Sequence, residues 1–523
     1  MEFMTAIKNS LDNEYNTSIT ENGAVGFRTT GKALLDLNFA VASMRNASER
    51  EIISKYEAAY RENKLLALKW LFFARDIRGG LGERRLFRII AEHLAQTHPE
   101  VIIPVIELIS EYGRYDDLWC LLDTPAAENI YRMVDIQLKT DWLNMIAKKP
   151  TSLLAKWMPS INASSAKTKV YARKMCKALH MTKGDYRKAL SCLRKHLNIV
   201  ETKMSQREWS AIEYDKVPSR ANLIYNNAFL RNDTDRRKNY LAALEKGEAK
   251  INAGTLFPHD IVHKYCNNCY SVKATDVTLE QLWKALPDTV QGCNNTMVVA
   301  DGSGSMCSSV DPRSGLTALE VANALAIYFA ERSSGQFKNK YITFSNHPQY
   351  VAFPKCSNLR DKILEAREHC EVANTNIEAV FDLILHTAIA NNMKQEDLPQ
   401  NILIISDMEF DSCVTTNKGD RYSTFKPTKK LFEVFAERYA AAGYKLPRLV
   451  FWNVCSRTNT IPVKENALGV ALVSGFSPNV AKMVMSGKLD PYECLLETLN
   501  SERYAPVEKA LETIVGQKSS IDF

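Results

Sequence analysis

The spacing of the apolar residues changes at Thr296, and this change most constrains how the chain can fold. From Gly31 to about Leu286, apolar residues recur at helical intervals, with almost no strand-like alternation. Beyond Thr296, short apolar runs alternate with amphipathic stretches. A chain of 523 residues with such a change is expected to be a multidomain α and α/β protein.

The helical pattern has recognisable starts and stops. Ser48, followed by Glu51, predicts a capped helix start, and the apolar pattern then continues to Phe72. Roughly 250 residues of short helices predict a solenoid of degenerate repeats, whose concave or ring-like surface suits a polymeric ligand. We expect four parts: an N-terminal segment (1–30), a helical repeat domain (31–290), an α/β domain (296–476) and a helical tail (477–523).

Positive charge is concentrated in one stretch of the helical part. Between Lys148 and Lys195 the sequence has thirteen Lys or Arg and a single acid, Asp185. Such an excess indicates a polyanionic partner, although a solvated face is the alternative. The candidate residues for contacting such a polyanion are Lys167, Lys169, Arg173, Lys174, Lys177, His180, Arg187, Lys188, Arg194 and Lys195.

Two amphipathic helices are expected to carry these residues. A helix over 169–180 places its basic side chains on one side, and Gly184 and Asp185 are predicted to stop it and cap a second helix. The apolar sides lack Trp and Phe, which favours burial in a helical stack over binding to a membrane surface. The candidates for base stacking, each of which fits a core position equally well, are Tyr171, Tyr186 and Trp157.

Two other groups of residues resemble ligand sites but are expected to have structural roles. Gly79, Gly80 and Gly82 lack the Lys-Ser/Thr of a P-loop and are expected to form a turn between helices. The possible phosphate contacts near this turn are Arg75, Arg78, Arg84 and Arg85. On one helix, the zinc-like side chains of His259, His263, Cys266 and Cys269 are too spread out to share an ion, so packing is expected.

The C-terminal pattern predicts a doubly wound parallel sheet with a helix from Thr317 to Arg332. The predicted strands are 297–300, 341–345, 401–406, 449–454 and 469–473. Asp301 and Asp407 follow two of these strands, at the edge where such sheets bind ligands.

The run Asp301-Gly302-Ser303-Gly304-Ser305 has the chemistry of a metal loop. Its glycines permit a tight turn, so one carboxylate and two hydroxyls can face the same point. Hard oxygen ligands of this kind suit Mg²⁺ or Mn²⁺ and suit zinc poorly. A simple turn is the alternative explanation.

These residues resemble known families. Asp301, Ser303 and Ser305 are similar to the metal-ion-dependent adhesion site of von Willebrand A domains; Thr375 matches that family's threonine loop, and Asp407 its second acidic position. The segments 75–84 and 111–118 resemble the TROVE-like module of Ro autoantigen-type proteins. The resemblance is closest to a branch of that group found in plants, large DNA viruses and phages, which segments 217–220 and 254–260 also fit.

The resemblance covers nearly the whole chain and implies a ring of HEAT-like helical repeats closed by a von Willebrand A domain. It also implies binding of single-stranded ends or small structured noncoding RNA, with Mg²⁺ (or Mn²⁺) in the A domain stabilising the ring or recruiting an acidic protein ligand. We therefore expect a non-catalytic RNA-binding protein. A metal-dependent interaction scaffold without RNA is the alternative, and a metal hydrolase has least support because no second Asp or nearby His base accompanies Asp301.

The composition of the chain predicts the cellular location of the protein. No apolar run reaches the ~20 residues of a membrane span, and Met1–Ser10 has no apolar signal region. The twelve cysteines form no disulfide framework, as expected of reduced thiols. We expect a cytoplasmic protein (in the host cytoplasm if it is viral) without a membrane partner.

Overall fold

The computed structural model of the protein forms two compact units. It describes Met4, Ile7, Lys8, Leu11 and residues 15–519, except 268–270, 291–294, 312–313, 354–355, 357, 372, 412–430, 465–468 and 485–489. One unit, here called the sheet unit, comprises residues 1–64 and 256–499; the other, the helical unit, comprises residues 65–255 and 500–523. The predicted helical domain of residues 31–290 is therefore shared between the two.

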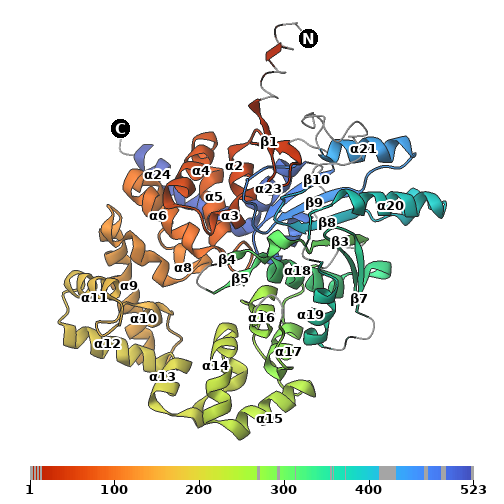
Figure 1. Cartoon of the computed structure of the whole chain (residues 1–523). Coiled ribbons are helices and arrows are strands. Elements are labelled where there is room, and N and C mark those ends of the chain that lie inside the picture. The colour runs from red at the N-terminus through yellow and green to blue at the C-terminus, as the bar shows by residue number, and fades with distance from the viewer. Residues whose placement is uncertain are drawn as a thin grey trace. The chain divides into compact units, whose positions relative to one another are not determined.

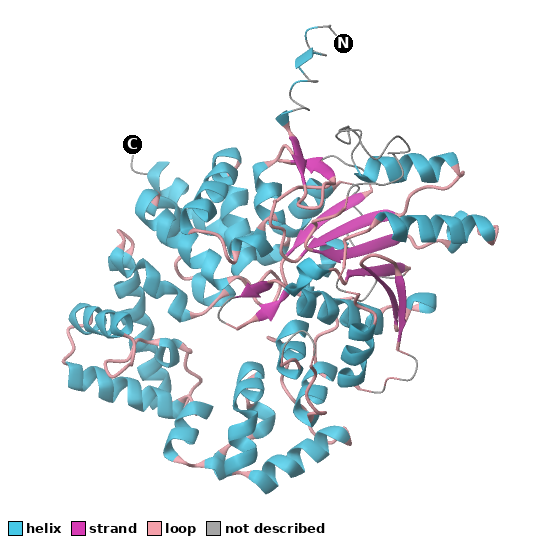
Figure 2. Ribbon diagram, in the orientation of Figure 1, coloured by secondary structure: helices cyan, strands magenta, loops and turns pink. Residues whose placement is uncertain are grey.

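The sheet unit contains a six-stranded sheet in the order β10-β9-β8-β3-β6-β7 (Figures 1 and 2). The strands are β3 (Thr296–Asp301), β6 (Lys340–Phe344), β7 (Gln349–Ala352), β8 (Asn401–Ser406), β9 (Arg448–Asn453) and β10 (Val470–Ser474). All neighbours are parallel except β7, which pairs antiparallel with β6. The five predicted strands are confirmed, but the sheet is mixed, because a short hairpin adds an unpredicted edge strand.

Helices cover both faces of this sheet. Phe451 and Trp452 are consecutive residues of β9 and therefore point to opposite faces. The Phe451 ring lies 4.6 Å from that of Phe432 in α21 (Leu431–Ala441), and the Trp452 ring lies 5.5 Å from that of Phe329 in α18 (Ala318–Arg332). The doubly wound α/β arrangement follows from this alternation.

The N-terminal residues also belong to the sheet unit. They form an antiparallel hairpin, β1 (Thr17–Ile19) and β2 (Val25–Phe27), which the helical periodicity did not predict. The helices that follow are α2 (Ala33–Phe39), α3 (Val41–Met44) and α4 (Glu49–Glu62). Ser48 caps α4 by accepting a hydrogen bond from the Glu51 amide, as predicted, but α4 ends before Asn63 and does not continue to Phe72.

Further helices complete the sheet unit. They are α16 (Pro258–Tyr265), α17 (Val277–Lys284), α19 (Leu359–Glu368), α20 (Glu378–Ala390), α22 (Ala481–Val484) and α23 (Pro491–Leu499). His263 of α16 contacts Glu320 of α18, with Nδ1 2.9 Å from Oε2, and the Cys266 thiol lies 2.9 Å from a nitrogen of Arg367. Two of the four zinc-like side chains thus have other partners, and Cys269 lies outside the described residues.

The helical unit contains no strand among its described residues. Its main helices are α5 (Lys64–Arg75), α6 (Arg84–Thr97), α9 (Ala127–Ile146), α10 (Leu154–Trp157), α11 (Ala166–Ala178), α12 (Lys183–His196), α13 (Val200–Gln206), α14 (Ser219–Asn232), α15 (Thr234–Glu245) and α24 (Ala505–Ser519). Shorter turns are α7 (Pro99–Ile102), η1 (Ile103–Val105), α8 (Ile109–Tyr112), η2 (Tyr115–Asp123), η3 (Trp209–Ala211), η4 (Tyr214–Lys216) and η9 (Glu502–Tyr504).

Charged residues of segments 75–84 and 111–118 form a buried network in the helical unit. Asp117 is fully buried and accepts from Arg75, which is itself buried, so Arg75 is not the phosphate contact considered from sequence. The buried Asp76 pairs with Arg503 of η9 and accepts a hydrogen bond from the Tyr504 hydroxyl. These motif residues therefore stabilise the fold.

The glycine turn between α5 and α6 has the predicted structural role. Gly82 has φ = 73°, a conformation that favours glycine. At Gly80, a Cβ would lie 2.0 Å from the Phe73 carbonyl oxygen, so no side chain fits there.

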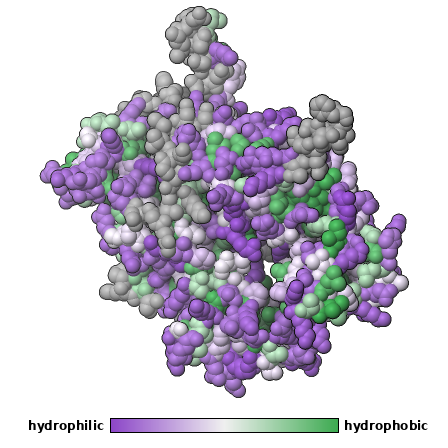
Figure 3. All heavy atoms as spheres, turned by 180° about the vertical axis from the view of Figure 1, so that it is seen from behind, coloured by the Kyte–Doolittle hydropathy of each residue, from purple (hydrophilic) through white to green (hydrophobic). Residues whose placement is uncertain are grey.

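The protein surface is of mixed polarity. Figure 3 shows hydrophilic side chains over most of the face seen from behind, with hydrophobic ones in separate areas. Among the described helices, none combines the length and the apolar character that a membrane crossing requires.

Candidate metal centre and nucleic-acid interface

The sheet topology brings the two predicted metal-binding aspartates together. β3 and β8 are parallel neighbours, with Ala300 opposite Ile405, so Asp301 and Asp407 emerge at the same edge. Since β6 lies on the other side of β3, the strand order reverses direction here, which is where doubly wound sheets bind ligands.

The loop after β3 turns back on its own carboxylate. Asp301 is buried; its Oδ1 accepts a hydrogen bond from the Ser303 amide (2.9 Å), and its Oδ2 accepts one from the Ser406 hydroxyl (2.5 Å). The hydroxyls of Ser303 and Ser305 lie 3.0 Å apart. One carboxylate and two hydroxyls thus share a small region, as the spacing predicted.

Thr375 reaches this site through its loop. The Gly304 amide donates to the Ala373 carbonyl oxygen (3.0 Å), which holds the threonine loop against the loop after β3. Thr375 is buried, and its hydroxyl accepts a hydrogen bond from Nδ2 of Asn22 in the N-terminal hairpin (3.2 Å).

Burial makes it unfavourable for both aspartates of the site to be charged. Burial raises the pKa of both Asp301 and Asp407, and the charge of Asp407 raises that of Asp301 further. Hydrogen bonds from Ser303 and Ser406 to Asp301, and from Ser305 to Asp407, oppose these shifts. Two buried carboxylates at one edge need a cation or a proton to neutralise them.

One oxygen of the site has no hydrogen bond from the described residues. Asp407 is buried, and its Oδ2 accepts none; the nearest described cation is the guanidinium of Arg457, at 3.5 Å. Within the described part of the chain, no three His, Cys, Asp or Glu side chains converge as a metal cluster. A site here would therefore combine two carboxylates with hydroxyls, and an all-oxygen set of this kind fits Mg²⁺ or Mn²⁺.

The N-terminal hairpin borders the site. This contact was not predicted from the sequence. The Glu21 carboxylate pairs with Arg457 (2.5 Å), whose guanidinium also faces Asp407. Glu409 is buried and accepts hydrogen bonds from the amides of Glu21 and Arg457 (2.9 and 2.7 Å). Glu409 was visible as the second acid of Asp-Met-Glu after β8, but no spacing links residue 22 to residue 375.

The two predicted basic helices are present, with different ends. α11 is capped by Ser165, and α12 begins after Thr182, whose hydroxyl accepts from the Asp185 amide (3.1 Å). The predicted stop and cap at Gly184 and Asp185 were wrong: both lie inside α12. His180, with φ = 51°, takes the left-handed conformation that follows the end of α11.

Most of the predicted basic side chains face solvent. The exposed ones are Lys167, Arg173, Lys177, His180, Arg187, Lys188 and Lys195; Lys169, Lys174 and Arg194 are half-buried. Lys174 pairs with Asp123, and Arg194 donates to the Ala155 and Met158 carbonyl oxygens and to Ser160. These two cations already have partners within the fold, whereas no described carboxylate pairs with the seven exposed ones.

Two of the three stacking candidates lie in the core. Tyr171 and Tyr186 are buried, and the Tyr186 hydroxyl donates to the Pro159 carbonyl oxygen (2.8 Å). Trp157 is half-buried, with the guanidinium of Arg114 4.2 Å from its ring centroid. Trp157 therefore remains the candidate with an accessible surface.

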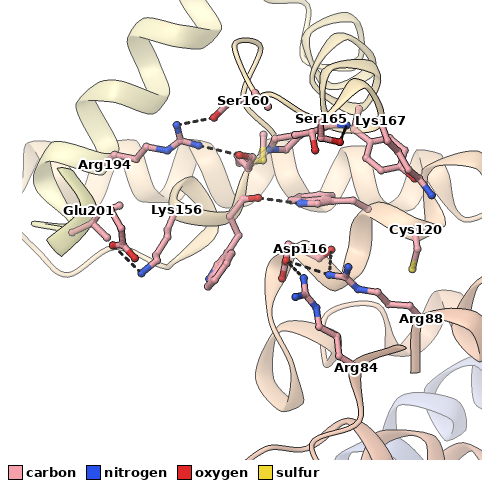
Figure 4. A pocket seen from close by; sticks show the side chains of 18 of the residues that line it. Arg84, Arg88, Asp116, Cys120, Lys156, Ser160, Ser165, Lys167, Arg194 and Glu201 are labelled. Atoms are coloured by element: carbon pink, nitrogen blue, oxygen red, sulfur yellow. Dashed lines mark hydrogen bonds and ion pairs between the residues drawn. The ribbon is translucent and has the colours of Figure 1, made fainter. Parts of the chain in front are cut away.

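A cleft of about 970 Å³ opens beside the basic helices. Lys167 and Arg194 of the predicted set line it, together with Arg84, Lys156 and Trp157. Figure 4 shows Arg84 and Arg88 directed at Asp116 from one side, with Lys156, Arg194 and Ser160 on the other. Sequence periodicity could not reveal this cleft, because its walls come from helices separated along the chain.

Comparison with known proteins places the chain in a family. The profile described as "Domain of unknown function (DUF2828)" matches residues 20–124 and 128–298, more than half of the chain. The chain belongs to the DUF2828 family. The profile described as "Domain of unknown function (DUF7788)" matches residues 295–514. The two matches meet at the start of β3, where the apolar pattern changes.

A curated relative matches this DUF2828 chain over nearly its full length. It is the "Uncharacterized protein L728" of Acanthamoeba polyphaga mimivirus, 30% identical over 539 residues. The match covers 95% of this chain and 90% of that protein. The match therefore extends over both family regions of this chain.

Proposed function

We propose that this protein binds RNA without catalysing a reaction, using the exposed faces of α11 and α12. The observation that carries the proposal is the set of exposed cations on these helices that have no carboxylate partner among the described residues. Unpaired cations on one surface neutralise phosphates and release counterions, which makes binding salt-sensitive. RNA is favoured over other polyanions by the resemblance to Ro-type proteins, which implies single-stranded ends or small structured noncoding RNA.

We further propose that the helical unit consists of HEAT-like repeats and that the sheet of the other unit is of von Willebrand A type. The position of Asp301 and Asp407 beside β3, with three hydroxyls, supports this assignment. Asp301, Ser303, Ser305, Thr375 and Asp407 would hold Mg²⁺ or Mn²⁺. The ion would supply a positive centre for a carboxylate or phosphate oxygen, because neutral hydroxyls leave much of its charge uncompensated.

A pair of matched triple variants tests the RNA surface. Lys177→Glu, Lys188→Glu and Lys195→Glu reverse three exposed charges on α11 and α12; the control reverses three exposed lysines elsewhere in the helical unit, Lys238, Lys246 and Lys250. Both triples change net charge equally. We expect the first to weaken RNA binding on the order of 100-fold and to reduce the salt slope by about 2. Equal loss in both triples would reject the assignment of this surface.

An acidic protein ligand at the metal centre is the second candidate function. Oδ2 of Asp407, which accepts no hydrogen bond from the described residues, offers an ion a carboxylate oxygen. The neutral hydroxyls of the ligand set leave part of the ion's charge uncompensated, so the ion attracts an acidic side chain of a partner. Protein capture that requires Mg²⁺ and disappears in Asp301→Ala, from a sample free of nucleic acid, would support this function over RNA binding.

A further inference from the structure

The cleft beside α11 and α12 has more positive charge than the fold neutralises. The guanidiniums of Arg84 and Arg88 line one wall, and they share an ion-pair network with those of Arg75 and Arg114, which do not line the cleft. Their ion pairs go to only two carboxylates, Asp116 and Asp117. Partly buried charges are normally compensated, so this wall has room for an anion.

The opposite wall adds cations that acids do not fully balance. Arg194 donates hydrogen bonds only to uncharged oxygens, from Ala155, Met158 and Ser160. Lys156 lies 3.5 Å from Glu201, and Lys167 forms no ion pair with a described carboxylate, although the charge of Glu92, which also lines the cleft, acts on it. Five Lys or Arg therefore line the cleft against three acids, Glu92, Asp116 and Glu201, and Figure 4 shows cationic side chains on both sides of it.

The volume of the cleft and its other lining residues indicate which class of anion it can hold. A volume of about 970 Å³ is far larger than a phosphate ion requires and lies within the range of small-molecule sites. Trp157 contributes an accessible aromatic ring, whereas Trp119 and Tyr171 of the lining are buried, and Ser160, Ser165 and Thr168 contribute hydroxyls. Cations, aromatic rings and hydroxyls together match the phosphate, base and sugar of a nucleotide.

We propose that this cleft binds one unpaired nucleotide, with its phosphate at the wall of Arg84 and Arg88 and its base against Trp157. The choice of a nucleotide among anionic ligands rests on the RNA binding proposed above. Lys167 lies on α11 and also lines the cleft, so an RNA strand on the basic faces of α11 and α12 can continue into it.

Filling the cleft tests the proposal without disturbing the arginine network. Ser205 is exposed on α13 and lines the cleft; Ser210 is equally exposed in η3 and does not line it. In the full chain, we expect calorimetry to show binding of UMP and AMP, with uridine and inorganic phosphate at least tenfold weaker. Ser205→Trp should weaken UMP binding at least tenfold, and Ser210→Trp should leave it unchanged.

A second measurement separates this inference from the proposed function. Wild-type protein should prefer an RNA hairpin with a single-stranded tail to the same hairpin with a blunt end, and Ser205→Trp should lose that preference while still binding the blunt hairpin. Absence of UMP binding, or equal effects of the two tryptophan variants, would overturn the cleft assignment. UMP binding without any RNA binding would overturn the proposed function and leave the cleft as a mononucleotide site.

Discussion

At the scale of single residues, Arg457 links the N-terminal hairpin to the candidate metal centre. Its guanidinium contacts the carboxylates of both Glu21 and Asp407, at 2.5 and 3.5 Å. A positive charge beside Asp407 repels a divalent ion, and Glu21 offsets that charge. The two side chains should therefore have opposite effects on metal affinity.

Neutral variants of Arg457 and of Glu21 test these opposite effects on metal affinity. We expect Arg457→Gln to raise the affinity for Mg²⁺ about tenfold and Glu21→Gln to lower it about threefold, the smaller effect reflecting the exposure of Glu21. Isothermal titration with Mg²⁺ measures both, and Asp301→Ala, which removes a proposed ligand, is the control that should abolish binding. A shift of both variants in the same direction would contradict this account.

The contrast between these residues and the metal loop shows how far sequence reasoning reaches. Asp301, Ser303 and Ser305 lie within five positions, so their spacing alone brings them together. Asn22 and Glu21 contact Thr375 and Arg457, each more than 350 positions away, through a hairpin whose strands have only three residues each. Local periodicity contains no information about such a contact.

At the scale of elements, strands and helix faces were predicted more reliably than element ends. The five parallel strands are mostly apolar runs and were evident, whereas β7 is an edge strand of four residues in which only Val351 is buried. The end of α11 was misplaced because His180 adopts the left-handed conformation usually given to glycine. Gly184 instead lies in α12, where a Cβ would have room.

The contact between α16 and α18 gives a pH-dependent stability. A hydrogen bond from His263 to the Glu320 carboxylate raises the pKa of His263 in the folded protein. A raised pKa stabilises the fold at pH values below the unfolded pKa of about 6.5, and this contribution is lost as pH rises through the folded pKa.

Thermal unfolding of His263→Gln at two pH values checks the sign. The loss of melting temperature relative to wild type should be larger near pH 5.5 than near pH 8.5. His347 is a suitable control, because it is exposed and 3.8 Å from its nearest carboxylate, Glu371. A larger loss at the higher pH would contradict the assigned protonation.

At the scale of the whole molecule, η9 and α24 belong to the helical unit although they are the last elements among the described residues. The Tyr112 ring stacks on that of Tyr504 (5.7 Å), and Arg503 pairs with the buried Asp76. Removal of one partner of such a pair leaves a buried charge uncompensated, which destabilises a fold.

Substitution of Arg503 should therefore destabilise the helical unit. Because Arg503 is partly exposed, we expect Arg503→Ala to lower the free energy of unfolding by roughly 1–3 kcal/mol, at the lower end of buried pairs. The exposed neighbour Glu502, changed to Ala, should have little effect. Hydrogen exchange of the amides in α5 and α6 measures the stability of both variants. Equal protection in the two variants would contradict the role of the Arg503–Asp76 pair.

Neither unit is continuous along the chain, because the backbone passes between them at residues 64–65, 255–256 and 499–500. Asp76 is synthesised 427 residues before Arg503. A ribosome delivers the N-terminal residues first, so the first long helices emerge with a buried aspartate whose partner does not yet exist. Folding of the helical unit must therefore be completed after Arg503 is translated, and the nascent chain has a long interval in which chaperones can act on it.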